Sequence, residues 1–202
     1  MKFKSKNLFI LLAVICSTYF TAESKNMKKA TFGSGCFWCT EAIFAELKGV
    51  LALEPGYAGG HLDNPTYKQV CTGTTGYAEV CHIDYDEGVI TFTELLEVFF
   101  ATHDPTTLNQ QGNDKGTQYR SVIFYHNSEQ KQISEEILKE LDNSGAFQNK
   151  IVTEISPFNK YFKAENYHDN YYAQNPEQSY CQFVIKPKLD KFKKVFKNKL
   201  KK

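Results

Sequence analysis

The sequence predicts an α+β fold, a two-layer sandwich in which helices pack on a mixed β-sheet. The first observation is the order of the periodic segments, which runs strand, helix, strands, helix, strand, helix and strand along the chain. The second is the alternation of residue character at 77–85 and 119–125, which is typical of half-buried strands. The third is the apolar spacing of three and four residues at 92–100 and 133–141, which is typical of amphipathic helices.

Residues 1–22 have the pattern of a secretory signal peptide. Lysines at the start form a basic region, and the apolar run 8–15 that follows is too short for a convincing membrane span. Ala22 is the expected last residue of the leader, although the cleavage site is poorly defined, and an uncleaved N-terminal anchor is the alternative. We therefore expect residues 23–202 to form a single domain that is exported, to the periplasm, with membrane anchoring left open.

Charge and cysteine content restrict the functions to consider. The 202 residues carry a formal net charge of +1, which gives no reason to expect nucleic acid as a partner. An odd number of cysteines follows the leader, which does not match a framework of structural disulfides and leaves a thiol for redox chemistry. These cysteines are Cys36, Cys39, Cys71, Cys81 and Cys181.

The first predicted strand, 29–32, leads through a glycine-rich turn into a predicted helix that begins at Cys36, runs to about Leu47 and is capped by Gly49. Unpaired N–H groups and the helix dipole favour an anion at the first turn, so we expect the Cys36 thiol to lose its proton easily. A buried cysteine that acts as a small hydrophobe is the alternative. The glycines around the sulfur favour the reactive interpretation, because they let another molecule approach closely.

The next elements contain a candidate acid. Residues 50–53 predict a strand, 55–65 a glycine-rich loop and 77–85 a strand that carries Glu79 between apolar neighbours. Desolvation would raise the pKa of a carboxyl group there and let it hold a proton near neutrality. An ordinary glutamate that faces water from an edge strand is the alternative.

A capped helix and a long polar loop follow. Thr91 and Glu94 form a capping box before an apolar stripe that ends at Phe100. Residues 103–118 form a polar loop, and loops of that length are usually functional. The later elements are a strand at 119–125, a helix at 128–144 followed by Gly145, a strand at 151–155 and an amphipathic basic helix within 186–202.

Cys36 and Cys39 form a Cys-x-x-Cys pair that allows three interpretations. A zinc site is the weakest, because Cys71 and Cys81 are ten residues apart and no histidine pairs with them. A thioredoxin-like dithiol at a helix N-terminus is stronger. In the third, which we favour, Cys36 alone is the nucleophile and Cys39 belongs to the apolar stripe of its helix.

Several motifs stand in one order along residues 28–187. They are GCFWCTE at 35–41, GYAGG at 56–60, PTY at 65–67, VCTGTTGYAEV at 70–80, HDPT at 103–106, GTQYRS at 116–121 and AENYH at 164–168. Together they resemble the peptide methionine sulfoxide reductase A family, and the combination is far more specific than any single motif. We accordingly predict a ferredoxin-like core for the two-layer sandwich.

The resemblance implies that Cys36 is the nucleophile and that Glu79 donates a proton to the sulfoxide oxygen. It also implies an apolar pocket for the methyl group of the sulfoxide. Phe37 and Trp38 would form that pocket, and Tyr67, Tyr119 and Asp114 would hold the oxygen and a site water. The alternative for the tyrosines is that they are packing residues with a wet tip.

The resemblance further implies a cycle in which Cys36 becomes a sulfenic acid, a second cysteine forms a disulfide with it, and a thioredoxin-type reductant restores both thiols. Many members of the family carry the second cysteine near the C-terminus, so Cys181 is the expected resolving residue. Cys39 or an external thiol is the alternative. We expect Cys71 and Cys81 to be packing residues.

The implied activity is reduction of the S epimer of methionine sulfoxide, in proteins and as the free amino acid, without a cofactor or metal and by a monomer. Two other functions stay open. An exported thiol–disulfide oxidoreductase would use the Cys36–Cys39 pair as its dithiol, and a non-catalytic binding module would carry a degenerate site.

Overall fold

The structure of the protein is a computed structural model in which residues 26–201 are described. The predicted signal peptide lies outside the described residues. Within them, no helix combines the length and the apolar character that crossing a membrane requires.

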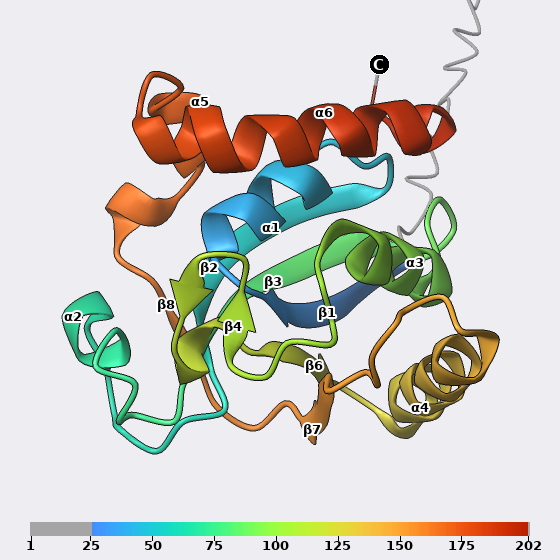
Figure 1. Cartoon of the computed structure of the whole chain (residues 1–202), viewed down its shortest axis with the longest axis horizontal. Helices are drawn as coiled ribbons and strands as arrows, with labels where there is room; N and C mark the ends of the chain where they lie inside the picture. Colours follow the sequence, from blue (N-terminus) through green and yellow to red (C-terminus); the bar gives the residue numbers. More distant parts are fainter. Residues whose placement is uncertain (1–25, 202) are drawn as a thin grey trace, which may run out of the picture.

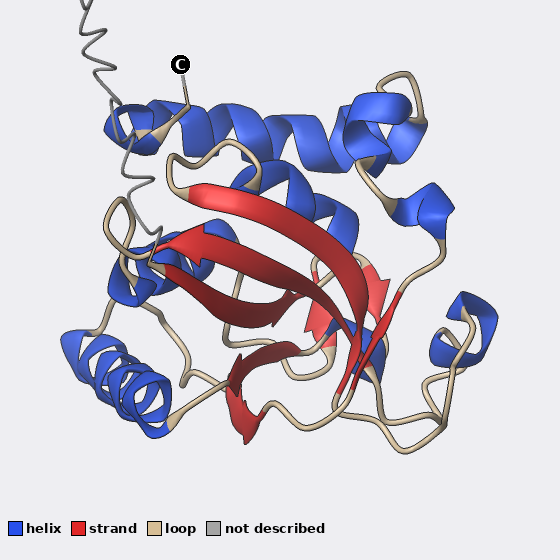
Figure 2. Ribbon diagram, turned by 180° about the vertical axis from the view of Figure 1, so that it is seen from behind, coloured by secondary structure: helices blue, strands red, loops and turns tan. Residues whose placement is uncertain are grey.

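The protein is built on a curled, mixed sheet of six strands in the order β7-β6-β1-β3-β2-β8 (Figure 2). All neighbouring strands are antiparallel except β6 and β7, which are parallel. The bounds are β1 Met27–Ser34, β2 Val50–Ala58, β3 Ala78–Asp86, β6 Ser121–Tyr125, β7 Glu154–Pro157 and β8 Tyr161–Lys163. The predicted α+β class with helices on a mixed sheet is confirmed.

Helices cover one face of this sheet, and α6 lies across α1 as an outer layer (Figure 1). The main helices are α1 Phe37–Phe44, α3 Phe92–Thr102, α4 Ser128–Ser144 and α6 Lys186–Val195. Shorter elements are α2 Tyr67–Val70, α5 Tyr171–Gln174 and the two-stranded hairpin of β4 Gln110–Gln111 and β5 Asp114–Lys115. The main core lies between these helices and the sheet, where Phe32 of β1 packs against Phe44 and Phe99.

The helix signals of the sequence are reproduced closely. The Glu94 N–H donates to Thr91 Oγ1 at 3.2 Å and the Thr91 N–H donates to Glu94 Oε2 at 2.8 Å, which is the predicted capping box. Gly145 ends α4 with a φ of +71°, a left-handed conformation that glycine adopts without strain.

Several boundaries differ from the predictions: the strand predicted at 151–155 is β7 Glu154–Pro157, the strand predicted at 119–125 is β6 Ser121–Tyr125, and two further differences have a clear cause. The first helix ends at Phe44 rather than Leu47, because the C-terminal residues pair with the segment that follows it: the Lys48 N–H donates to the Lys199 carbonyl at 2.8 Å, and the Lys201 N–H donates to the Glu46 carbonyl at 2.7 Å. Strand β2 runs on through the predicted loop to Ala58, because it is paired on both sides, by β3 and by β8.

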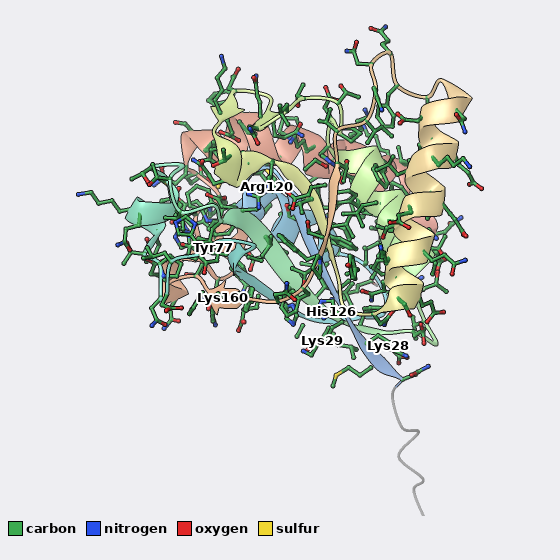
Figure 3. The ribbon with its side chains drawn as sticks, turned by 90° about the horizontal axis from the view of Figure 1, so that it is seen from below. Lys28, Lys29, Tyr77, Arg120, His126 and Lys160 are labelled. Carbon is green, nitrogen blue, oxygen red and sulfur yellow. The ribbon has the colours of Figure 1, made fainter. Side chains whose placement is uncertain are left out.

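The opposite face of the sheet carries a small polar cluster. Thr31 Oγ1 lies 2.8 Å from His82 Nδ1 and 3.0 Å from His126 Nε2, and Lys29 Nζ lies 3.3 Å from His82 Nε2. Lys29 also forms an ion pair with Asp84. Lys29 and His126 are labelled in Figure 3, which views the molecule from below. The two imidazoles are half-buried, and their burial lowers both pKa values, that of His126 to about 4.

Candidate active site

Cys36 stands at the point where β1 has ended and α1 begins. Its backbone is extended, with φ −60° and ψ 126°, and its carbonyl accepts the Cys39 N–H at 3.1 Å, so it is the N-cap of α1. Gly35 before it has a φ of +96°, and a side chain there would collide with Gln111 of β4. The glycine therefore allows the hairpin to lie directly against the turn that carries the thiol.

The Cys36 thiol is protonated in the resting site. Only 7% of the residue is exposed, and this burial raises its pKa well above the usual value, with smaller contributions in the same direction from Cys39 and Glu79. The sequence-based expectation of easy proton loss is therefore wrong for the resting site. The helix terminus favours an anion, but burial beside a carboxyl group outweighs it.

Glu79 faces Cys36 from strand β3 and is almost completely buried, with 1% exposure. Its Oε2 accepts the Phe37 N–H at 3.1 Å, while its Oε1 is buried and has no partner among the described residues. Burial raises its pKa to about 8, and Asp114 and Cys39 add to the rise. The expectation of a carboxyl group that keeps its proton near neutrality is confirmed.

Tyr67, Tyr119 and Asp114 gather around the same carboxyl group. Burial raises the pKa of both tyrosines, and Glu79 is the largest charged contribution to each, so their hydroxyls stay protonated as hydrogen-bond donors. Asp114 on β5 accepts the Tyr180 hydroxyl at 2.6 Å. The structure therefore brings together the predicted nucleophile, the acid and the three polar residues.

The two aromatic residues after the nucleophile have different environments. Phe37 is fully buried and packs on Tyr67 with ring centroids 6.3 Å apart. Trp38 is half-buried and stacks on Tyr171 at 3.6 Å with nearly parallel rings. Trp38 thus supplies the accessible aromatic wall, and Phe37 supports it from within.

Four residues with clear roles in the site were not predicted from the sequence. Trp38 Nε1–H donates to His168 Nδ1 at 3.0 Å, and Tyr171 stacks on the same indole. Glu165 accepts the Tyr67 N–H at 2.8 Å and the Tyr57 hydroxyl at 2.8 Å. The fourth, Tyr180, places its hydroxyl 3.8 Å from Cys39 Sγ. The motif at 164–168 was the available signal for His168 and Glu165, but a motif does not reveal hydrogen-bond partners.

The other described cysteines are also free thiols. Cys81 is fully buried, as expected of a packing residue, whereas Cys71 is exposed beside Tyr67, which contradicts that expectation. Cys181, the expected resolving cysteine, is buried at the start of the helical turn Cys181–Ile185, and burial raises the pKa of its thiol. Within residues 26–201, no group of three His, Cys, Asp or Glu side chains is arranged to hold a metal ion.

Comparison with known proteins gives one consistent result. The sequence profile of the family described as "Peptide methionine sulfoxide reductase" matches residues 28–200. A protein of Saccharolobus solfataricus named "Peptide methionine sulfoxide reductase MsrA" is 53% identical over 175 residues, which cover 87% of this chain and 98% of the relative. A protein of the same name from Acinetobacter baumannii strain AYE is 55% identical over 175 residues, covering 87% and 99%.

Solved structures agree with the sequence comparison. The reduced form of Mxr1 from Saccharomyces cerevisiae matches with a TM-score of 0.72 and 40% identity, covering 77% of this chain and 89% of that one. Mxr1 in complex with Trx2 matches with a TM-score of 0.51 and 28% identity, covering 72% and 84%.

Proposed function

The chain belongs to the peptide methionine sulfoxide reductase A (MsrA) family, and from that premise we propose how its site reduces a sulfoxide: Cys36 attacks the sulfur while Glu79 protonates the oxygen. The activity is that of a peptide-methionine (S)-S-oxide reductase. The assignment of individual residues to this activity is our proposal.

One observation carries the proposal. Glu79 is a buried carboxyl group with one oxygen held by the Phe37 N–H and the other without a partner among the described residues. An unpartnered buried oxygen is costly unless a ligand uses it. A sulfoxide oxygen is an acceptor, and a protonated carboxyl group beside the nucleophile is the donor that it needs.

The atoms of this step balance without a co-reactant. The Cys36 sulfur bonds to the sulfoxide sulfur as Glu79 transfers its proton to the oxygen, and the oxygen then passes to Cys36. The products are methionine and a sulfenic acid on Cys36. The proton that Cys36 loses on attack returns to Glu79, so the acid is ready for the next substrate.

The surrounding residues select the geometry of the substrate. Tyr67 and Tyr119 keep protonated hydroxyls near Glu79, where they can donate to an oxygen that gains negative charge. Asp114 accepts the hydroxyl of Tyr180. Together these two groups would bind a water molecule in the site. Trp38, supported by Phe37, takes the methyl group. A methyl pocket on one side of a chiral sulfur and donors on the other fit one epimer only.

The remaining proposals concern partners, location and topology. A thioredoxin-type protein restores the enzyme, as the complex of the related Mxr1 with Trx2 suggests. Both free and protein-bound methionine sulfoxide are substrates. The enzyme acts as a monomer, and nucleic acid is not among its partners.

Residues 1–22 direct export to the periplasm, and residues 23–202 form one catalytic domain. The order β6-β1-β3-β2, with α1 and α3 as crossovers, supports a ferredoxin-like core.

A single-turnover assay tests the function. The purified chain is mixed with each epimer of methionine sulfoxide, free and in a peptide, without any added reductant, and methionine is quantified. We expect up to one methionine per chain from the S epimer and none from the R epimer. A Cys36→Ser variant that still formed methionine, or equal reduction of both epimers, would contradict the proposal.

A further inference from the structure

Cys36 and Cys39 lie three residues apart at the N-terminal end of α1. They occupy the N-cap and the third position of α1, and the Cys39 N–H donates to the Cys36 carbonyl at 3.1 Å. Burial and the neighbouring Cys39 thiol raise the pKa of Cys36, whereas the neighbouring Cys36 thiol lowers the pKa of Cys39. Residues three apart at a helix N-terminus are neighbours on its surface, and a disulfide can join Cα atoms about 4.4–6.8 Å apart.

The surroundings of Cys39 favour its thiolate. Its sulfur lies 3.8 Å from the Tyr180 hydroxyl, and both this hydroxyl and the charge of Lys188 on α6 lower its pKa. Burial and the carboxyl group of Asp114 act in the opposite direction, but the net shift is downward. A thiol with a lowered pKa, three residues from the nucleophile, is well placed to attack an oxidised sulfur.

The other cysteines are worse placed to meet Cys36. Cys181 is fully buried in the turn Cys181–Ile185, which continues into α6 and packs against the core through Ile185 and Leu189. Its thiol would reach Cys36 only if that turn unwound. Cys71 is exposed beside Tyr67, and Cys81 is buried with its thiol donating to the Phe37 carbonyl at 3.4 Å.

We propose that Cys39 is the resolving cysteine of this reductase. Its thiolate attacks the Cys36 sulfenic acid, an S–S bond forms as the S–O bond breaks, and hydroxide leaves as water with the proton that Cys39 gave up. The step needs no further oxidant, because the sulfoxide has already oxidised Cys36 by two electrons. The inference rests on the proposed function, since it requires the sulfenic acid on Cys36.

Mapping the disulfide after one turnover tests the inference. Trypsin cuts after Lys29 and Lys48, so the single peptide 30–48 contains both Cys36 and Cys39. After reaction with S-sulfoxide peptide in the absence of reductant, we expect this peptide lighter by two hydrogen atoms. Linkage of the same peptide to one that contains Cys71 or Cys181 would overturn the proposal.

A matched series of Cys39→Ala, Cys71→Ala and Cys181→Ala gives the second measurement. Each variant should form methionine in the first turnover, but only Cys39→Ala should stop at a sulfenic acid that dimedone traps. Disulfide formation by Cys39→Ala at the parent's rate would overturn the inference while leaving the proposed function intact. If the parent forms no methionine at all, the proposed function fails, and this inference fails with it.

Discussion

The Phe37 backbone N–H donates to Oε2 of Glu79 at 3.1 Å, which ties the proposed acid to the residue directly after the proposed nucleophile. The bond fixes one carboxyl oxygen and leaves the other for substrate. Because the donor belongs to the first turn of α1, this hydrogen bond links the segment that carries Cys36 to strand β3, which carries Glu79. The two residues proposed to react with the substrate are thus positioned by the start of α1 and by strand β3.

Glu79→Gln should slow the first turnover by about 10²–10⁴-fold, because the amide keeps the size of the side chain but cannot transfer a proton. Rapid-quench measurement of methionine formation gives the rate. Iodoacetamide should still alkylate Cys36 in this variant, and exposed Glu136→Gln on α4 serves as the control. Reduction by Glu79→Gln at the parent's rate would show that another group is the acid.

The same carboxyl group should destabilise the protein in alkaline solution. Its pKa is raised to about 8, above the unfolded value, so its contribution to stability is present below pH 4 to 5 and is lost as the pH rises toward 8. Glu79→Gln removes this loss and should be more stable than the parent at pH 9 by several kcal/mol, as an order of magnitude. Urea unfolding at pH 6 and pH 9 measures the difference; parallel curves for the two proteins would contradict it.

The polar cluster of Thr31, His82 and His126 on the opposite face of the sheet should destabilise the protein in acid rather than in alkaline solution. The pKa of His126 is lowered to about 4, so its neutral form contributes stability above pH 6.5 that disappears as the pH falls toward 4. Because the ring is half-exposed, solvent screening limits the contribution to about 1–2 kcal/mol. His126→Gln should flatten the loss of stability between pH 7 and pH 5, without abolishing it, since His82 and His103 also have lowered pKa values.

Gly35→Ala should inactivate the protein, whereas Gly112→Ala should not. Both glycines have positive φ, so alanine costs about 1–2 kcal/mol of backbone strain at either position. Only at Gly35 does a new Cβ also meet another side chain, that of Gln111. The collision at Gly35 should push the turn that carries Cys36 out of place, whereas backbone strain alone should not. Turnover and thermal stability of the two variants separate these effects, and equal losses of activity in both would contradict the role of the collision.

His168→Phe should raise KM more than it lowers kcat. The replacement keeps an aromatic ring against Phe37 but removes the acceptor for the Trp38 N–H, a hydrogen bond of about 1 kcal/mol. A rise in KM of roughly fivefold is therefore expected from a less well-oriented indole. When Trp38 is already replaced by Phe, His168→Phe should cause no further rise in KM. Additive rises in KM in this double-mutant cycle would contradict the role of His168 in positioning the Trp38 indole.

The elements set by local chemistry were predictable, and those set by distant contacts were not. The Thr91 capping box and the Gly145 end of α4 are local signals, and both are where the sequence indicated. The length of β2 depends on pairing with β8, and the end of α1 depends on Lys199 and Lys201, which no local pattern reveals.

The site shows the same division. Cys36 and Glu79 were candidates from motif and alternation and were chosen from the family resemblance, and the raised pKa of Glu79 agrees with the desolvation expected on a half-buried strand. The protonation of Cys36 was misjudged, because the sequence shows a helix terminus but not how deeply the thiol is buried. Tyr180 was missed because its partners, Asp114 and Cys39, lie far away in the sequence.

The pairing of the last residues with the segment after α1 has a consequence for biosynthesis. Lys199 and Lys201 hold residues 46–48, and Tyr180 reaches the cysteine pair from just before α6. The ribosome therefore synthesises Cys36 and Cys39 well before Tyr180 and the two lysines, which contact the cysteine pair and the segment after α1. A nascent polypeptide thus contains both thiols before the segment that packs over them exists, so we expect a fragment that ends before Tyr180 to expose the cysteine pair to oxidation.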